Sequence, residues 1–293
     1  MAETVYFDGV FFDLLEEIAQ ETCSDESSLL TAIDSFFKKF GFTDIVLFQK
    51  ADQIIDPKDA KKSDQRTHQK TDQRTDQKSD PKNESAAANS PSSIYQNLFK
   101  TPDLFIRYYK GVEISVDNEN ELYARIRKER PKADFLTVRS DDEKIIRAAA
   151  DSLDVDAVVP ISNSPQKPAA GKINHIAAKI AADKKTAFAF DIAPLLYTKG
   201  YRRSKLISDI MEMIPILRKY CVPILLFSGA SGIFDIRGPY ELEAVGRLFG
   251  MTQEETISAV SEFPRKIISE RKKKISGKII APGVEIIEEN SEE

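Results

Sequence analysis

The sequence predicts an α/β fold, an irregular TIM-like (β/α) barrel with about seven parallel strands. Short apolar runs alternate with amphipathic segments along the chain, which is typical of parallel strands covered by helices. The chain has 293 residues, and 250 remain when the foreign segment 51–93 is set aside. That length is close to the ~250 residues of such barrels.

Seven segments are predicted as strands. They cover residues 5–12, 44–48, 111–116, 134–138, 155–159, 186–191 and 224–227. The last is a continuous apolar run, as a strand covered on both faces needs. Because helical segments separate most of these strands, we expect them to run parallel.

Helices are expected between the strands from apolar residues at helical spacing and from their end signals. One such face consists of Leu29, Ile33, Phe36 and Phe40, closed by Gly41. Another spans residues 206–217, where Pro215 is expected to bend the helix. Two capping boxes are predicted, Ser140 with Glu143 and Thr252 with Glu255.

The predicted barrel is a single domain that spans residues 1–50 and 94–263, and two segments differ from it in composition. Residues 51–93 contain a four-residue repeat, no aromatic residue and eight residues of each charge. They predict a low-complexity disordered insertion; a weak tethered RNA contact through Arg66, Lys70, Arg74 and Lys78 stays open. Residues 264–293 predict a basic helix followed by an acidic tail.

Bulk composition excludes several classes of protein. The net charge is −5, so any nucleic-acid binding must come from local patches. The two cysteines are far apart in sequence, which favours a reduced cytoplasmic setting without disulfides. No signal peptide and no membrane-spanning run is indicated.

The residues predict no catalytic group and no metal site on the chain. Of two histidines, His68 lies in the repeat, which leaves His175 with Asp8 and Asp191 as possible ligands. These are too few for multimetal hydrolysis. Ser228 lacks the nucleophile-elbow pattern, and no phosphate-binding Gly-Lys loop occurs.

Cations at strand ends are the remaining candidates for function. Arg139, Arg202, Arg203 and Arg237 follow predicted strands, so their guanidinium groups could share one rim and meet phosphates. Each could equally be solvated or ion-paired. His175 is either an exposed helix residue or an RNA contact. Asp191 is expected to bind a neighbouring loop or Arg237.

The segment 265–278 is a second candidate for RNA contact. It holds seven basic residues and one acidic residue, and its contact candidates are Arg271, Lys272, Lys273 and Lys274. A dense positive field of this kind binds phosphates without sequence selectivity. The alternative is a solubilising helix end, partly neutralised by the five glutamates of residues 285–293.

One block of the sequence resembles a known family. It is a Ser-Gly-Ala element at residues 228–230, then Arg237 and Pro239, and a helix ending in Leu-x-Gly-Met at residues 248–251. This pattern is similar to the archaeal ribonuclease P protein component 3 family, the p30-type subunits. The resemblance covers most of residues 5–252 outside the insertion, and its loop adds Ser228 as a contact candidate.

The resemblance implies an irregular barrel related in fold to the polymerase-and-histidinol-phosphatase hydrolases. Those begin with His-x-His on the first strand, where this chain has Phe7-Asp8-Gly9. It also implies a noncatalytic subunit of ribonuclease P, the ribonucleoprotein that removes the 5′ leader of precursor tRNA.

The expected partners are the ribonuclease P RNA, component 2, the other protein components and, through the holoenzyme, precursor tRNA. Magnesium would belong to the RNA, and no cofactor to this chain. Two alternatives remain: a stand-alone metal-dependent phosphoesterase barrel and a structural interaction barrel outside ribonuclease P.

Overall fold

The computed structural model describes residues 5–11, 13–21, 26–51, 96–101, 104–162, 168–275, 279–281 and 284–285. Among them, seven strands form one parallel sheet in chain order. The strands are β1 Phe7–Phe11, β2 Asp44–Lys50, β3 Arg107–Ser115, β4 Phe135–Arg139, β5 Ala157–Val159, β6 Ala187–Asp191 and β7 Ile224–Phe227. The predicted seven-stranded α/β barrel is confirmed, and β3 begins earlier than expected.

The sheet closes through the residues that follow β7. Val10 forms a parallel bridge with Ala230. The Phe11 N–H donates to the Ala230 carbonyl at 2.8 Å, and the Gly229 N–H donates to the Gly9 carbonyl at 3.0 Å. Gly229 has φ +61°, and a Cβ there would lie 2.7 Å from the Asp191 Cβ, so the closing turn requires glycine.

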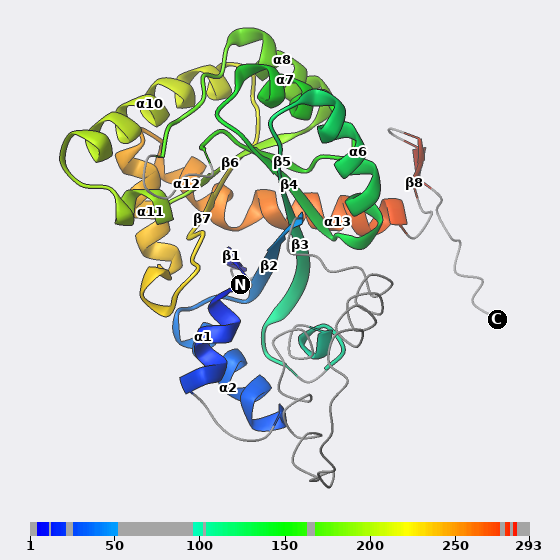
Figure 1. Ribbon diagram of the computed structural model, residues 1–293, viewed down its shortest axis with the longest axis vertical. Coiled ribbons are helices and arrows are strands. Elements are labelled where there is room, and N and C mark those ends of the chain that lie inside the picture. Colours follow the sequence, from blue (N-terminus) through cyan, green and yellow to red (C-terminus); the bar gives the residue numbers. More distant parts are fainter. Residues whose placement is uncertain are drawn as a thin grey trace, which may run out of the picture.

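Helices surround the barrel (Figure 1). They are α1 Asp13–Glu21, α2 Glu26–Lys39, α6 Glu119–Glu129, α7 Glu143–Asp151, α8 His175–Lys184, α9 Ala193–Tyr197, α10 Gly200–Lys219, α11 Pro239–Leu248, α12 Gln253–Val260 and α13 Glu262–Ile275. Shorter elements are the 3-10 turns η2 Arg130–Lys132 and η3 Ile233–Asp235, and a hairpin of β8 Ile279–Ala281 with β9 Val284–Glu285. No helix within the described ranges is long and apolar enough to cross a membrane.

Most of the expected helices are present. After α2, Gly41 adopts φ +87° as the predicted stop, and α10 runs through Pro215 to Lys219. The predicted capping box at the start of α12 is confirmed: the Glu255 N–H donates to Thr252 Oγ1 at 3.2 Å, and the Thr252 N–H donates to Glu255 Oε2 at 2.8 Å.

The predicted capping box of α7 is wrong. Asp142 is the N-cap residue, and its carboxylate accepts the Lys144 N–H at 2.7 Å. Ser140 Oγ instead accepts the Asp142 N–H at 3.1 Å, which tightens the preceding turn. Asp142 prevails because it directly precedes Glu143, the first helical residue, and a carboxylate is a strong cap.

Aromatic rings fill the interior of the barrel. Phe48, Phe135 and Phe227 lie with their ring centroids 6.0 to 6.1 Å apart. A Cβ at Gly9 would lie 2.7 Å from the Phe48 ring, so β1 can approach this cluster only with glycine. Because these rings fill the interior, the two ends of the barrel form separate surfaces.

The basic segment of the sequence forms much of α13, which lies against the amino-terminal ends of the strands. Figure 1 shows α13 crossing beside β2 and β3. Ile268 of α13 is buried, and it shares a cleft with Phe7 and Asp44, the first residues of β1 and β2. The predicted insertion beyond Ala51 and most of the predicted acidic tail lie outside the described residues.

Candidate functional site

The mouth of the barrel, formed by the carboxyl ends of the strands, holds a buried ion-pair triad of Glu113, Arg139 and Asp191. Arg139 Nε donates to Glu113 Oε2 at 2.9 Å, and Nη2 donates to Asp191 Oδ2 at 2.8 Å. The three residues are 3 to 6% exposed. The guanidinium of Arg139 is thus enclosed between carboxylates from β3 and β6, and it does not reach the surface as a phosphate contact would require.

The triad is electrostatically coupled. Burial acts to lower the pKa of Arg139, but Asp191 and Glu113 raise it above its ordinary value. Burial raises the pKa of the Glu113 carboxyl, with Arg139 opposing that rise. The cavity that these side chains line measures only about 10 Å³, which is room for about one water molecule.

The residues at the mouth do not fit a divalent metal. Such an ion needs several carboxylate or imidazole ligands converging on an open position. Here the guanidinium of Arg139 lies between Glu113 and Asp191, and Asp8 is engaged elsewhere. No group of three His, Cys, Asp or Glu residues that could hold a metal occurs within the part of the chain that the structure describes.

Asp8 and Ser228 join β1 to the loop after β7. The Ser228 N–H donates to Asp8 Oδ1 at 2.6 Å, and the Ser228 hydroxyl donates to Asp8 Oδ2 at 2.5 Å. Both residues are 0% exposed. Burial raises the pKa of Asp8 to about 7, although these hydrogen bonds act to lower it. Ser228 therefore closes the barrel from inside and is enclosed, unlike a contact residue.

The other predicted arginines lie in the first turn of α10 and in the loop between η3 and α11. Arg202 and Arg203 are exposed near the start of α10, and Arg203 Nε donates to the Thr198 carbonyl at 2.7 Å. Arg237 Nη1 donates to the carbonyls of Phe234 and Ile236 at 2.8 and 2.6 Å. The expected pairing of Asp191 with Arg237 is wrong: Asp191 of β6 pairs with Arg139 of β4, across the intervening strand β5, while Arg237 binds its own loop.

Three exposed aromatic residues accompany these arginines, and sequence reasoning missed them. Tyr197, Tyr201 and Phe234 are 53%, 81% and 85% exposed. The hydroxyl of Tyr197 bonds to the carboxylate of Asp235, which ties α9 to η3. These residues come from three different elements without periodicity, so only their exposure in the fold reveals them.

His175 is the exposed first residue of α8. Its ring centroid lies 5.8 Å from that of Tyr220, and Asn174 before it caps the helix by accepting the Ala177 N–H at 2.8 Å. These contacts fit the interpretation of His175 as an exposed helix residue.

The amino-terminal end of the barrel carries an open cleft of about 360 Å³. Its lining comes from the starts of β1, β2 and β3 and from α13: Phe7, Asp44, Arg107, Tyr109, Arg265, Ile268, Ser269, Lys272 and Lys273. Two of the predicted contact residues, Lys272 and Lys273, are thus brought together with Arg107, a residue 165 positions before Lys272 in the sequence. Lys274 is exposed and does not line the cleft.

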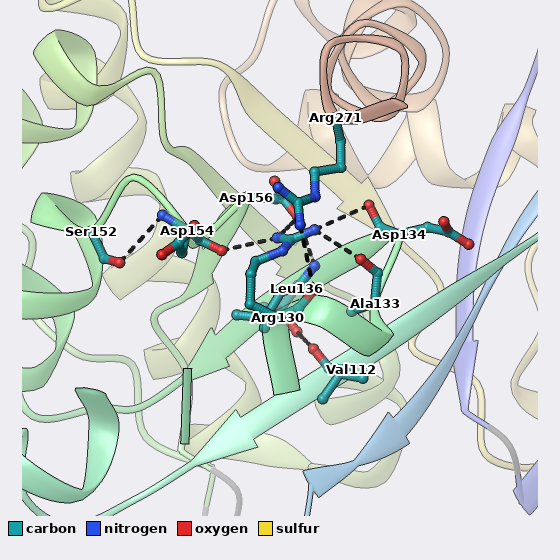
Figure 2. A network of polar contacts seen from close by, with 10 residues as sticks. Val112, Arg130, Ala133, Asp134, Leu136, Ser152, Asp154, Asp156 and Arg271 are labelled. Atoms are coloured by element: carbon teal, nitrogen blue, oxygen red, sulfur yellow. Dashed lines mark hydrogen bonds and ion pairs between the residues drawn. The ribbon is translucent and has the colours of Figure 1, made fainter. Parts of the chain in front are cut away.

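Arg271, another predicted contact, takes part in docking α13. Figure 2 shows its side chain pointing from the helix toward Arg130, whose carbonyl accepts from Arg271 Nη2 at 3.5 Å. Arg130 Nη1 donates to Asp156 Oδ2 at 2.5 Å and to the Asp154 carbonyl at 2.9 Å. Burial and the nearby Arg130 lower the pKa of Arg271.

Comparison with known proteins identifies relatives of this fold and sequence. A family model described as RNase P subunit p30 matches residues 12–276. The chain is 38% identical over 180 residues to Ribonuclease P protein component 3 of Methanococcoides burtonii, covering 61% of this chain and 72% of that protein. It is 34% identical over 181 residues to the component 3 of Methanosarcina barkeri, covering 62% and 73%.

A solved structure shares the fold. A chain in a cryo-EM structure of archaeal Ribonuclease P with mature tRNA matches with a TM-score of 0.60 and 20% identity, covering 98% of this chain and 100% of that chain. The family model extends over nearly the whole barrel and α13. The chain therefore belongs to the RNase P subunit p30 family.

Proposed function

We propose that this protein is a noncatalytic subunit of ribonuclease P that binds the ribonuclease P RNA together with component 2. In this role it assists the RNA in removing the 5′ leader of precursor tRNA, in the cytoplasm and with the other protein components. Family membership supports the subunit role. Magnesium for the reaction would be held by the RNA.

One observation carries the noncatalytic part of the proposal. In (β/α) barrels the reacting groups lie at the carboxyl ends of the strands. Here that position holds the Glu113–Arg139–Asp191 triad, in which the charged groups bind one another. A carboxylate held by a buried guanidinium is a poor ligand for a metal and a poor base for water.

The exposed rim around the mouth is our candidate surface for RNA or component 2. Arg202 and Arg203 follow the exposed Tyr201 in the first turn of α10, and Arg237 binds the carbonyl of the exposed Phe234. Arginine with tyrosine is a combination that recognition surfaces favour, both for protein and for RNA.

Reconstitution tests the proposed function. The purified chain is incubated with precursor tRNA and with phosphate esters, in magnesium or manganese, alone and with ribonuclease P RNA and component 2. We expect no turnover by the chain alone and faster cleavage when it joins the RNA and component 2, relative to the same mixture without it. Robust hydrolysis by the chain alone would instead favour the metal-dependent phosphoesterase.

A further inference from the structure

The side chains that line the cleft beneath α13 include more cations than carboxylates. Four cationic side chains line it, Arg107, Arg265, Lys272 and Lys273, against the single carboxylate of Asp44. That carboxylate is 0% exposed. It already accepts two hydrogen bonds from Arg107, one from the Tyr109 hydroxyl at 3.0 Å and one from the Thr43 hydroxyl at 2.8 Å.

The first cation, Arg107, is held in a fixed orientation. Its Nε and Nη2 each donate to Asp44 at 2.7 Å, a bidentate pairing, and the hydrogen bonds to Asp44 raise the pKa of Arg107. The side chain of Arg107 is nevertheless 57% exposed. A guanidinium has five N–H donors, so a group held in this way keeps donors for an anion in the cleft.

The other cations are carried by α13, whose docking sets the position of the helix against the barrel. Ile268 is buried between the helix and the strands, and Arg271 reaches the carbonyl of Arg130. Lys272 Nζ lies 4.7 Å from the ring centroid of Tyr109, over its face. Because Arg107 and Lys272 are held in this way and the helix is docked, binding an anion here costs less entropy than binding it to a flexible basic tail.

We propose that this cleft is a binding site for the phosphodiester backbone of RNA. This inference rests on the proposed function and names the surface that performs part of it. The size of the cleft, about 360 Å³, suits phosphate groups with their sugars. The Tyr109 ring, 8% exposed and covered by Lys272, offers no face for stacking a base, so the site binds without sequence selectivity.

A matched pair of variants tests the site on α13 itself. Arg265→Gln/Lys272→Gln removes two charges that line the cleft. Lys266→Gln/Lys274→Gln removes two charges from exposed residues of the same helix that do not line it. Affinity for the ribonuclease P RNA, with the full chain and component 2, is measured at several salt concentrations, and thermal unfolding of each variant shows that it is folded.

We expect the slope of log affinity against log salt to become shallower by about 0.7 to 0.9 for each lost phosphate contact in the cleft variant. The control should keep the wild-type slope. An equal change in both variants would mean a diffuse charge effect and overturn the site, as would an unchanged slope in the cleft variant. The proposed function is tested separately, because wild-type stimulation of cleavage would persist in either case.

Discussion

At the mouth of the barrel, Arg139 lies buried between the carboxylates of Glu113 and Asp191, whereas at the amino-terminal end Arg107, Arg265 and Lys272 line an open cleft with one carboxylate. Both ends are rich in arginine. They differ in whether the cation is enclosed by acids or left facing a cavity. The cavity at the mouth measures about 10 Å³ and the cleft about 360 Å³.

The arginine at the mouth therefore suits a role in stabilising the fold, whereas the cations that line the cleft suit binding of a ligand. In the triad two carboxylates enclose one guanidinium, so the buried group offers no net positive charge to an outside phosphate, but removing the guanidinium leaves buried acids without a partner. Exposed cations contribute little to stability and create the field that a polyanion follows. In this barrel the interior of the mouth, where activity usually lies, has the stabilising arrangement, and the cleft at the opposite end has an arrangement suited to binding a polyanion.

Removing the mouth cation should have the largest effect on stability. Arg139→Met leaves Glu113 and Asp191 buried without their partner, and we expect a loss of about 3–5 kcal/mol in the free energy of unfolding, measured in urea. Arg202→Met, an exposed arginine of the same rim, is the control and should cost less than about 0.5 kcal/mol. Equal effects of the two variants would remove the distinction between enclosed and exposed arginines.

A rescue sharpens this prediction. Adding Glu113→Gln and Asp191→Asn to Arg139→Met removes the uncompensated charges, and it should restore a large part of the lost stability. If the triple variant were less stable than Arg139→Met, packing rather than charge would dominate at the mouth.

Arg130 at the amino-terminal end should have a smaller effect. When Arg130 is removed, its partner Asp156 keeps a hydrogen bond from the Leu136 N–H at 2.7 Å. The side chain of Asp156 is also 14% exposed, so its charge is better solvated than those of Glu113 and Asp191. We expect Arg130→Met to cost about 2–3 kcal/mol in urea unfolding. Arg127→Met, at an exposed position near the end of α6, serves as the control. A cost above that of Arg139→Met would contradict the ranking.

The smallest effect is a pH dependence from Asp8. Burial raises the pKa of Asp8 from 3.8 to about 7, so the folded protein holds this proton more tightly than the unfolded chain. Its contribution to stability is fully present below about pH 4 and is lost as the pH rises through about 7. Between about pH 5.5 and 7 we expect a loss of about 1–2 kcal/mol.

Asp8→Asn isolates this contribution, because it keeps the shape of the side chain and cannot titrate. The difference in unfolding free energy between wild type and Asp8→Asn should fall as the pH rises, whereas other groups cancel in that difference. A difference that is flat with pH would show that Asp8 does not titrate in this window.

The fold could be predicted from the sequence because its signals are local. The run Ile224–Phe227 is apolar at every position, and Thr252 with Glu255 forms a cap within one turn. These patterns depend on neighbours in the chain. The incorrect capping box also has a local cause: Asp142, two residues after Ser140, caps the same helix start.

The candidate sites could be predicted only in part. The density of basic residues in α13 is visible in the sequence, and it predicts Arg271 to Lys274 as RNA contacts; of these, Lys272 and Lys273 line the cleft. The residues of α13 share the cleft with Arg107 and Tyr109, which lie more than 150 positions earlier in the sequence. No periodicity or motif connects residues so far apart.

The sequence by itself determined the strands, most helix ends and the concentration of positive charge near the end of the barrel, because propensity, capping and composition act over a few residues. Only the tertiary structure decided which cations are paired. Arg139 meets Glu113, 26 positions away, and Asp191, 52 positions away, because parallel strands bring their carboxyl ends together. Because the triad is buried, its charges require these partners. At the other end of the barrel, the packing of α13 against the strands places Arg107 and the cations of the helix around an open cleft.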